Sequence, residues 1–320
     1  SLEKASRLID AAADAGAHAI KLQTYTPDTI TLDCHEGEFF IEDPNSLWKG
    51  NSLYNLYKEA MTPWEWHKEL FDYAKEKGLL AFSTPFDLTA VDFLETLNPP
   101  CYKVASFENT DHAILAAVAK TGKPVIVSTG MASQAEIAES VEVLRSNGCD
   151  DIILLKCTSN YPANPVDANL KTIPHLSELF DCHVGLSDHT PGVGVAVAAV
   201  ALGATVIEKH FVLDRSGGEV DAEFSLEPHE IKLLVKETAR AAVAIGKVSY
   251  GATEREKASL VHRRSLYIAK DMKAGDTLNA ENLRSVRPGL GLPPKYLPLL
   301  LGKQIKCDVP KGTPMSWELL

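Results

Sequence analysis

Residues 184–211 read VGLSDHTPGVGVAVAAVALGATVIEKHF, and this stretch predicts the fold of most of the chain. Two short apolar segments, 184–190 and 205–211, each end in polar residues, and segment 193–202 between them has the length of a helix. Gly203 stands where this helix would end, and glycine favours the left-handed conformation of a helix C-terminal cap. The stretch is therefore predicted to form a strand, a helix and a second, parallel strand.

The same alternation recurs along the first 245 residues. Apolar segments that turn polar only at their C-terminal ends are typical of parallel strands buried on both faces. In a (β/α)8 TIM barrel these ends converge on one face, where barrel enzymes place their active sites. No GxGxxG fingerprint follows a strand, which disfavours a dinucleotide-binding sheet. The predicted strands are 19–25, 79–86, 102–108, 124–131, 152–161, 184–190 and 205–211, and the predicted helices are 1–16, 62–77, 87–96, 112–120, 133–147, 168–180, 193–202 and 227–245.

We therefore expect an α/β TIM-barrel domain over residues 1–245, a polar linker over 246–262 and a small, mostly β domain over 263–320. A barrel opens with a strand, whereas this sequence opens with a helix pattern, so we expect the first barrel strand to be absent from it. Residues 28–63 carry clustered aromatic residues and little periodicity. A segment of this kind is predicted to be a functional loop, such as a lid or a substrate wall.

Composition limits the classes of protein. The formal charge of -11 argues against a nucleic-acid or anionic-membrane partner. No apolar run approaches the roughly 20 residues that span a bilayer. The six cysteines show no CxxC pair, which favours reduced thiols in a cytoplasmic enzyme.

His189 and His210 end two strands that are neighbours in a barrel. Two imidazoles on adjacent strand ends could bind a divalent metal and leave positions for water and substrate. The alternative is that each histidine caps its strand end through hydrogen bonds. Two ligands alone leave both interpretations open.

Lysines and hydroxyl groups also gather near the strand ends. Convergent cations and donors are typical of a phosphate site. The alternatives are that each lysine pairs with a local carboxylate such as Glu108, or that Lys103 is a Schiff-base nucleophile. Glu108 is the best candidate for acid–base chemistry, and Asp188, Asp214 and Asp221 are further carboxylates at the same face. The residues of the cationic group are Lys21, Lys103, Thr84, Ser106, Ser128, Ser159 and Ser187.

Together these segments resemble the N-acetylneuraminate (sialic acid) synthase family, and the C-terminal region resembles its antifreeze-like (SAF) domain. The resemblance implies a TIM-barrel transferase that condenses phosphoenolpyruvate with an amino sugar and releases phosphate. The motifs that carry it are KLQ (21–23), FSTPFD (82–87), YKVAS (102–106), KPVIVSTGM (123–131), CTSNYP (157–162), GLSDHT (185–190), EKHF (208–211), RPG (287–289) and LGK (301–303).

The resemblance also implies a role for each residue. His189 and His210 become ligands of a divalent metal (Mn2+, Mg2+ or Co2+), and Glu108 takes the acid–base position. Family dimers swap the small domain, so a homodimer is implied in which Arg287 reaches the sugar of the other subunit. The implied phosphoenolpyruvate contacts are Lys21, Thr84, Lys103, Ser106, Ser128, Ser159 and Ser187, and Gln23, Tyr161 and Asp221 are implied to face the sugar.

Within the family, the segments at 47–67, 105–109 and 224–228 resemble the branch that forms pseudaminic acid. The implied acceptor is 2,4-diacetamido-2,4,6-trideoxy-L-altrose. Phe107 and the aromatic segment would provide apolar walls for this 6-deoxy sugar. The alternatives are an N-acetylneuraminate or legionaminate synthase and, more remotely, a Schiff-base aldolase or a sugar-binding protein.

Overall fold

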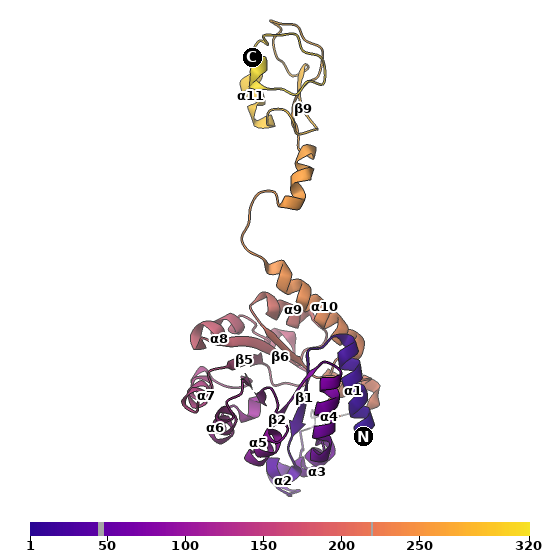
Figure 1. The fold of residues 1–320 in the computed structure, drawn as a ribbon, viewed down its shortest axis with the longest axis vertical. Coiled ribbons are helices and arrows are strands. Elements are labelled where there is room, and N and C mark those ends of the chain that lie inside the picture. The colour runs from indigo at the N-terminus through magenta and orange to yellow at the C-terminus, as the bar shows by residue number, and fades with distance from the viewer. Residues whose placement is uncertain (44–47, 219) are drawn as a thin grey trace. The chain divides into compact units, whose positions relative to one another are not determined.

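The computed structural model describes residues 1–43, 48–218 and 220–320. It forms two compact units, Ser1–Gly246 and Lys247–Leu320 (Figure 1). The sequence motif at 47–67 begins outside the described residues. No helix in the described part of the chain is long and apolar enough to cross a membrane.

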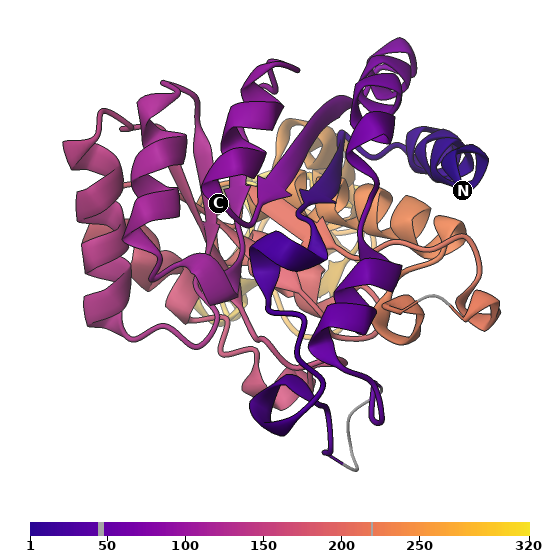
Figure 2. The same cartoon turned by 90° about the horizontal axis from the view of Figure 1, so that it is seen from below.

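A seven-stranded parallel sheet forms the centre of the first unit, and its strands follow one another in chain order. The sheet curls with helices on its outer side (Figure 2), as expected for a (β/α)8 barrel, and this predicted fold class is confirmed. Each strand lies within two residues of its predicted start. The strands are β1 (Ala19–Thr24), β2 (Leu80–Pro85), β3 (Tyr102–Val104), β4 (Val125–Ser128), β5 (Ile152–Cys157), β6 (His183–Asp188) and β7 (Val206–Lys209).

Several of the barrel helices begin or end at capping residues that the sequence provides. The Ser1 hydroxyl accepts a hydrogen bond from Lys4 N, and Gly16 closes the first helix with φ 84°. Ser133 and Glu136 form a reciprocal capping box at another helix start. These helices are α1 (Leu2–Ala15), α4 (Trp64–Glu76), α5 (Leu88–Glu95), α6 (His112–Lys120), α7 (Gln134–Ser146), α8 (Thr172–Phe180), α9 (Gly194–Ala201) and α10 (Pro228–Ile245).

A continuous apolar core joins these helices to the sheet. Burial of each large aliphatic side chain contributes about 1.5–3 kcal/mol. The core holds the strands rigidly, so their C-terminal ends are a fixed platform for side chains. Fully buried members include Ile9, Leu70, Leu94, Leu115, Leu144, Leu154 and Ile173.

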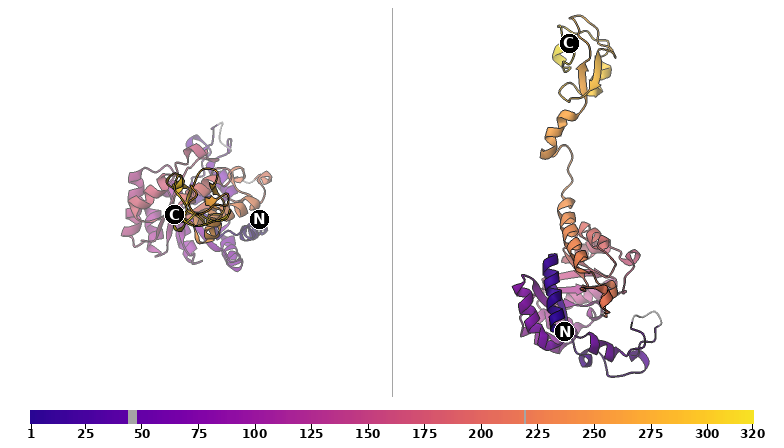
Figure 3. Two further views of the ribbon diagram at one scale, coloured as in Figure 1. Left: turned by 90° about the horizontal axis from the view of Figure 1, so that it is seen from above. Right: turned by 90° about the vertical axis from the view of Figure 1, so that its right-hand side faces the viewer.

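The segment after β1 contains helices where the sequence predicted an irregular loop. It holds α2 (Pro27–Ile30), the 3-10 turn η1 (Gly37–Phe39) and α3 (Leu53–Ala60). The helices α2 and α3 pack against each other (Figure 3). The α3 residue Tyr57 packs edge-on against Tyr25, with ring centroids 5.7 Å apart. This contact ties the segment to the end of β1.

Short 3-10 turns connect several of the strand ends to the following helices. They are η2 (Ser106–Glu108), η3 (Pro165–Asp167), η4 (Arg215–Gly217) and η5 (Ala222–Phe224). The turn η2 replaces the last part of the predicted strand 102–108. In this turn the side chains of Ser106 and Glu108 no longer follow the alternation between two faces that a strand would impose.

The second unit has its own small apolar core, which includes Leu266, Leu283 and Leu300. Its β8 (Ser265–Ile268) and β9 (Leu283–Val286) pair antiparallel, and Tyr267 of β8 forms a single β-bridge to Pro314. The predicted linker 246–262 contains the 3-10 helix η6 (Glu254–His262), capped by Thr253 and Glu256. The remaining elements are η7 (Pro294–Tyr296), α11 (Leu297–Leu300) and η8 (Trp317–Leu319).

Candidate active site

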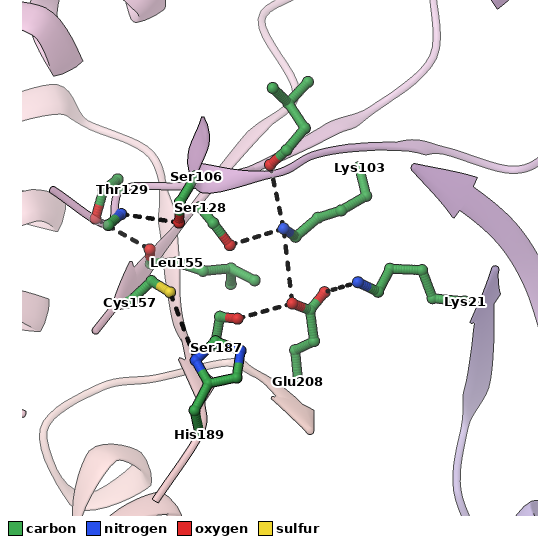
Figure 4. A network of polar contacts seen from close by, with 12 residues as sticks. Lys21, Lys103, Ser106, Ser128, Thr129, Leu155, Cys157, Ser187, His189 and Glu208 are labelled. Atoms are coloured by element: carbon green, nitrogen blue, oxygen red, sulfur yellow. Dashed lines mark hydrogen bonds and ion pairs between the residues drawn. The ribbon is translucent and has the colours of Figure 1, made fainter. Parts of the chain in front are cut away.

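Lys21 of β1 and Lys103 of β3 reach the same carboxylate, and that carboxylate is Glu208 (Figure 4). Lys21 Nζ lies 3.3 Å from Glu208 Oε2, and Lys103 Nζ lies 3.6 Å from Glu208 Oε1. Ser187 Oγ donates to Glu208 Oε1 at 2.8 Å. The sequence placed both lysines together but named Glu108 as their possible partner, whereas the structure gives Glu208.

This group, hereafter the cationic cluster (Lys21, Lys103 and Glu208), carries one more positive charge than negative. Burial lowers the pKa of Lys103 to about 8, with Lys21 adding to the effect and Glu208 opposing it. Burial would raise the pKa of Glu208, but the charges of Lys103 and Lys21 hold it well below its usual range. The cluster is therefore suited to accept an additional anion.

Lys103 itself is 2% exposed and has three acceptors around its ammonium group. Its Nζ donates to Ser128 Oγ at 2.7 Å and to Val104 O at 3.1 Å, and faces Glu208 as the third. An ammonium group has three N–H donors, so this arrangement matches its charged form. The geometry favours a counter-ion over a free amine nucleophile.

Two hydroxyl groups meet over Gly130, which lies two residues after the end of β4 at Ser128. A Cβ at position 130 would lie 2.2 Å from Ser159 Oγ and 2.6 Å from Ser106 Oγ. Gly130 N also donates to Ser106 Oγ at 3.1 Å. The absence of a side chain at Gly130 thus allows hydroxyls from η2 and from the loop after β5 to converge.

Two buried oxygen atoms lack a hydrogen-bond partner among the described residues, Thr84 Oγ1 and Glu108 Oε2. Burial raises the pKa of Glu108 to about 7, although the charge of Lys103 opposes this shift. Buried polar groups in proteins are almost always hydrogen-bonded. Unpaired oxygens beside a cationic cluster are therefore consistent with groups that await a ligand.

His189 and His210 lie side by side, with ring centroids 5.2 Å apart. His189 Nδ1 lies 3.1 Å from Thr158 O, and His210 Nδ1 lies 3.5 Å from Asp221 Oδ2. A metal-binding histidine typically donates one ring N–H to a carbonyl or carboxylate and uses the other nitrogen as ligand. Both rings have this arrangement. Burial lowers the pKa of His210, which favours the neutral imidazole that can bind a metal. The donor set fits a divalent metal.

Cys157 adjoins the histidine pair, and the sequence did not single it out. Its Sγ lies 3.9 Å from His189 Nδ1 and 3.8 Å from Ser159 Oγ. Burial would raise the pKa of this thiol, but interactions with His189 and the neighbouring hydroxyls lower it to about 7. The Cys157 thiol therefore ionises more readily than usual beside the His189 ring.

Two of the side chains predicted to face the sugar, Tyr161 and Asp221, lie against the histidines. The Tyr161 ring packs edge-on against His189 at 4.6 Å between centroids, and Asp221 contacts His210. Gln23 pairs in register with Thr84 at the ends of β1 and β2. Phe107 is 61% exposed, so its ring is free to contact a ligand. Arg287 is exposed in the second unit, immediately after β9.

A second acidic group lies at the start of α10, where ligand atoms of Glu227, His229 and Glu230 lie within 4.8 Å of one another. Its carboxylates already have partners. Glu227 Oε1 accepts from Arg215 N at 3.0 Å, and Glu230 Oε2 accepts from Glu227 N at 2.9 Å. This group therefore caps α10 and binds Arg215.

Two of the carboxylates that the sequence placed at the active face have other roles. Asp188 forms a buried ion pair with Lys209 at 2.9 Å. Asp214 accepts hydrogen bonds from Ser216 N and Ser216 Oγ. Like Cys157, Glu208 is a residue of the site that the sequence did not predict. Alternation along 205–211 could have identified it, because Glu208 and His210 are two residues apart and share a face.

These features place the chain among the α/β-barrel enzymes. Residues 8–250 match the NeuB family, and residues 263–320 match the SAF domain. The chain belongs to the NeuB family, which confirms the resemblance to sialic acid synthases.

Named relatives agree with this assignment. The chain is 45% identical to the pseudaminic acid synthase of Campylobacter jejuni, over 98% of this chain and 90% of that protein. It is 39% identical to the Helicobacter pylori pseudaminic acid synthase, over 98% and 92%. A solved N-acetylneuraminic acid synthetase from Leptospira borgpetersenii, in complex with citrate, matches with a TM-score of 0.70 and 34% identity, over 81% of this chain and 85% of that one.

Proposed function

We propose that this enzyme condenses phosphoenolpyruvate with 2,4-diacetamido-2,4,6-trideoxy-L-altrose and water to give pseudaminic acid and phosphate. The observation that carries the proposal is the cationic cluster at the barrel face. It lies in a chain 45% identical to a pseudaminic acid synthase. An excess of positive charge beside unpaired buried oxygens suits a phosphorylated carboxylic acid.

Phosphoenolpyruvate would lie against the cationic cluster and the hydroxyls around it. Lys21 and Lys103 compensate the charge of its phosphate and carboxylate, and Glu208 keeps the two lysines close together before substrate arrives. The remaining contacts would come from hydroxyl donors, which are Thr84, Ser106, Ser128, Ser159 and Ser187. These fixed donors cost little reorganisation during the reaction.

His189 and His210 would hold the divalent metal, for which Mn2+, Mg2+ and Co2+ are the candidates. Such a metal supplies Lewis-acid polarisation of the open-chain sugar aldehyde. Thr158 O and Asp221 fix the orientation of the two rings.

Carbon–carbon bond formation follows from this placement. C3 of phosphoenolpyruvate attacks the aldehyde carbon, the aldehyde oxygen takes up a proton from solvent to become a hydroxyl, and positive charge develops at C2. Water adds to C2 and gives its proton to Glu108, whose pKa of about 7 suits transfer in either direction near neutral pH. The tetrahedral intermediate then loses phosphate by cleavage of its C–O bond, and Lys21 and Lys103 stabilise the departing anion.

The sugar would extend from the histidines toward Gln23, Tyr161 and Asp221. Phe107 and the aromatic residues of α3 would contact its 6-deoxy and acetamido groups. We further propose a homodimer in which Arg287 of the partner subunit completes this end of the site.

Phosphate release tests the reaction directly. The enzyme is assayed with phosphoenolpyruvate and a panel of sugars, in the presence of manganese and after chelation. We expect release with the trideoxy altrose, little with N-acetylmannosamine, and loss of activity on chelation. Preference for another amino sugar would identify a sialic or legionaminic acid synthase. Chelator-resistant activity with a borohydride-trapped lysine would identify a Schiff-base aldolase.

The dimer has a separate test. Arg287→Ala protein is mixed with His210→Ala protein under conditions of proven subunit exchange. If Arg287 acts across the dimer, mixed dimers contain one complete site and activity returns. Inactive mixed dimers would show that Arg287 does not act in the partner's site.

A further inference from the structure

A charged residue precedes each histidine of the pair, Asp188 before His189 and Lys209 before His210. The register of β6 and β7 places Asp188 opposite Lys209, one step beyond Ser187 and Glu208. Side chains alternate along a strand, so Asp188 and Lys209 point to the face opposite that of Ser187 and Glu208. They do not belong to the cationic cluster.

Asp188 and Lys209 form a closed network behind the site. Lys209 Nζ lies 2.9 Å from Asp188 Oδ2, and the two side chains are 2% and 1% exposed. Asp188 Oδ1 accepts from Thr190 N at 2.9 Å and from Thr190 Oγ1 at 2.7 Å. Lys209 Nζ also donates to Thr190 O. The network thus contacts the residue on each side of His189 and the residue before His210.

Stability alone does not account for such a network. Desolvation of two charges offsets most of their attraction, and apolar residues of similar volume are often as stabilising. What apolar residues would not reproduce is the directional set of hydrogen bonds around residues 188–190. Those bonds fix the backbone that carries His189 relative to the strand that carries His210.

We propose that Asp188 and Lys209 are positioning residues for the metal site. Their ion pair joins the ends of β6 and β7 and sets the separation and orientation of His189 and His210. This inference rests on the proposed function, because it takes the two histidines as metal ligands. A metal site tolerates displacements of only about 0.5 Å before affinity falls, so a network that fixes both strand ends acts directly on affinity.

The test measures manganese binding to the full chain by calorimetry, together with thermal unfolding in the absence of metal. The informative variant is Asp188→Leu/Lys209→Met, which removes both charges and keeps the buried volume. We expect it to remain folded while its affinity for manganese falls by about 10–100-fold, as is typical when partners of metal ligands are lost. Unchanged affinity in the folded double variant would overturn the proposal.

Two further variants make the result unambiguous. Thr190→Val removes one hydrogen bond to Asp188 and leaves the ion pair, so it decides the question if the double variant does not fold. We expect its manganese affinity to fall several-fold, and unchanged affinity would count against the proposal. Lys123→Met is the matched control, because it breaks the Lys123–Glu95 pair near the start of β4 and should leave manganese affinity unaltered.

His189→Ala separates this inference from the proposed function. If His189→Ala binds manganese as the wild type does, the assignment of His189 as a metal ligand is wrong. If His189→Ala loses manganese while the double variant retains it, the metal site stands and the positioning role is wrong.

Discussion

The cationic cluster and the Asp188–Lys209 pair meet on β7, where Glu208 of the cluster is next to Lys209 of the pair, yet their charges are balanced differently. In the cluster, two lysines share one carboxylate, and the side chains of Lys21 and Glu208 remain 21% and 17% exposed. In the pair, one lysine meets one carboxylate, and both side chains are almost completely buried. Asp188 has partners on both oxygens, whereas Glu108, near the cluster, has a buried oxygen without one.

The difference separates the requirements of binding from those of structure. A network whose charges are balanced and whose polar atoms are all hydrogen-bonded has no group left to bind a ligand. Its effect is to fix the positions of the residues around it. A network with excess charge and unpaired oxygens is incomplete until a ligand arrives. The alternation of a β-strand allows both to be built from adjacent residues.

The largest effect on stability is expected for Lys209→Met. This change leaves Asp188 charged and buried without its counter-ion, and the loss of one partner of a buried ion pair typically costs about 3–5 kcal/mol. Lys103→Met should be far milder, because Glu208 retains Lys21 and the protein no longer buries a second cation. Urea unfolding of both variants measures the contrast. Comparable destabilisation by the two changes would contradict the distinction between the networks.

Gly130→Ala is expected to reduce function more than stability. The new Cβ would displace the hydroxyls of Ser106 and Ser159, and these flexible groups can rotate away at little cost to the fold. Loss of one or two hydrogen bonds to a charged ligand corresponds to about 10–100-fold in kcat/KM for phosphoenolpyruvate. Gly194→Ala is the control, because a Cβ there meets open space. Equal effects of the two substitutions would contradict the assignment of the hydroxyls.

A smaller effect, with a defined pH dependence, is expected for Glu108→Gln. The pKa of Glu108 is raised to about 7 by burial, so the folded state favours the protonated carboxyl. Its contribution to stability is complete below the unfolded pKa, about 4.3, and is lost as the pH rises through 7.

Glu108→Gln should therefore be more stable than the wild type at pH 8, by up to about 3 kcal/mol, and similar to it near pH 4.5. Its turnover should fall at the same time, since the amide cannot transfer the proton. Urea unfolding at the two pH values checks the sign. A stability difference that does not change with pH would show that Glu108 is not perturbed by burial.

The sequence predicted the barrel well because its determinants are local. Apolar strand cores, the Gly203 cap and the Ser133–Glu136 capping box are read along the chain, and the seven strands formed where they were expected. The adjacency of His189 and His210 followed from strand order. The roles assigned to individual residues at the barrel face remain predictions.

What the sequence did not predict depends on contacts across the barrel. The partner of Lys21 and Lys103 is fixed by the curvature of the sheet, which brings β1, β3 and β7 to one carboxylate. The helix α3 was missed although Ser52 marks its start and Leu53, Leu56 and Tyr57 have helical spacing. Its aromatic residues suggested a loop, because their burial against Tyr25 was not evident from the sequence.

Calorimetric titration with phosphoenolpyruvate at saturating manganese tests the central claim that the cationic cluster binds the anionic substrate. We expect Lys103→Met to weaken binding by about 1.5–3 kcal/mol, the usual loss for a charge-assisted contact. The Asp188→Leu/Lys209→Met variant, tested under the same conditions, should bind within about twofold of the wild type. Unchanged affinity of Lys103→Met, or an equal loss in both variants, would contradict the claim.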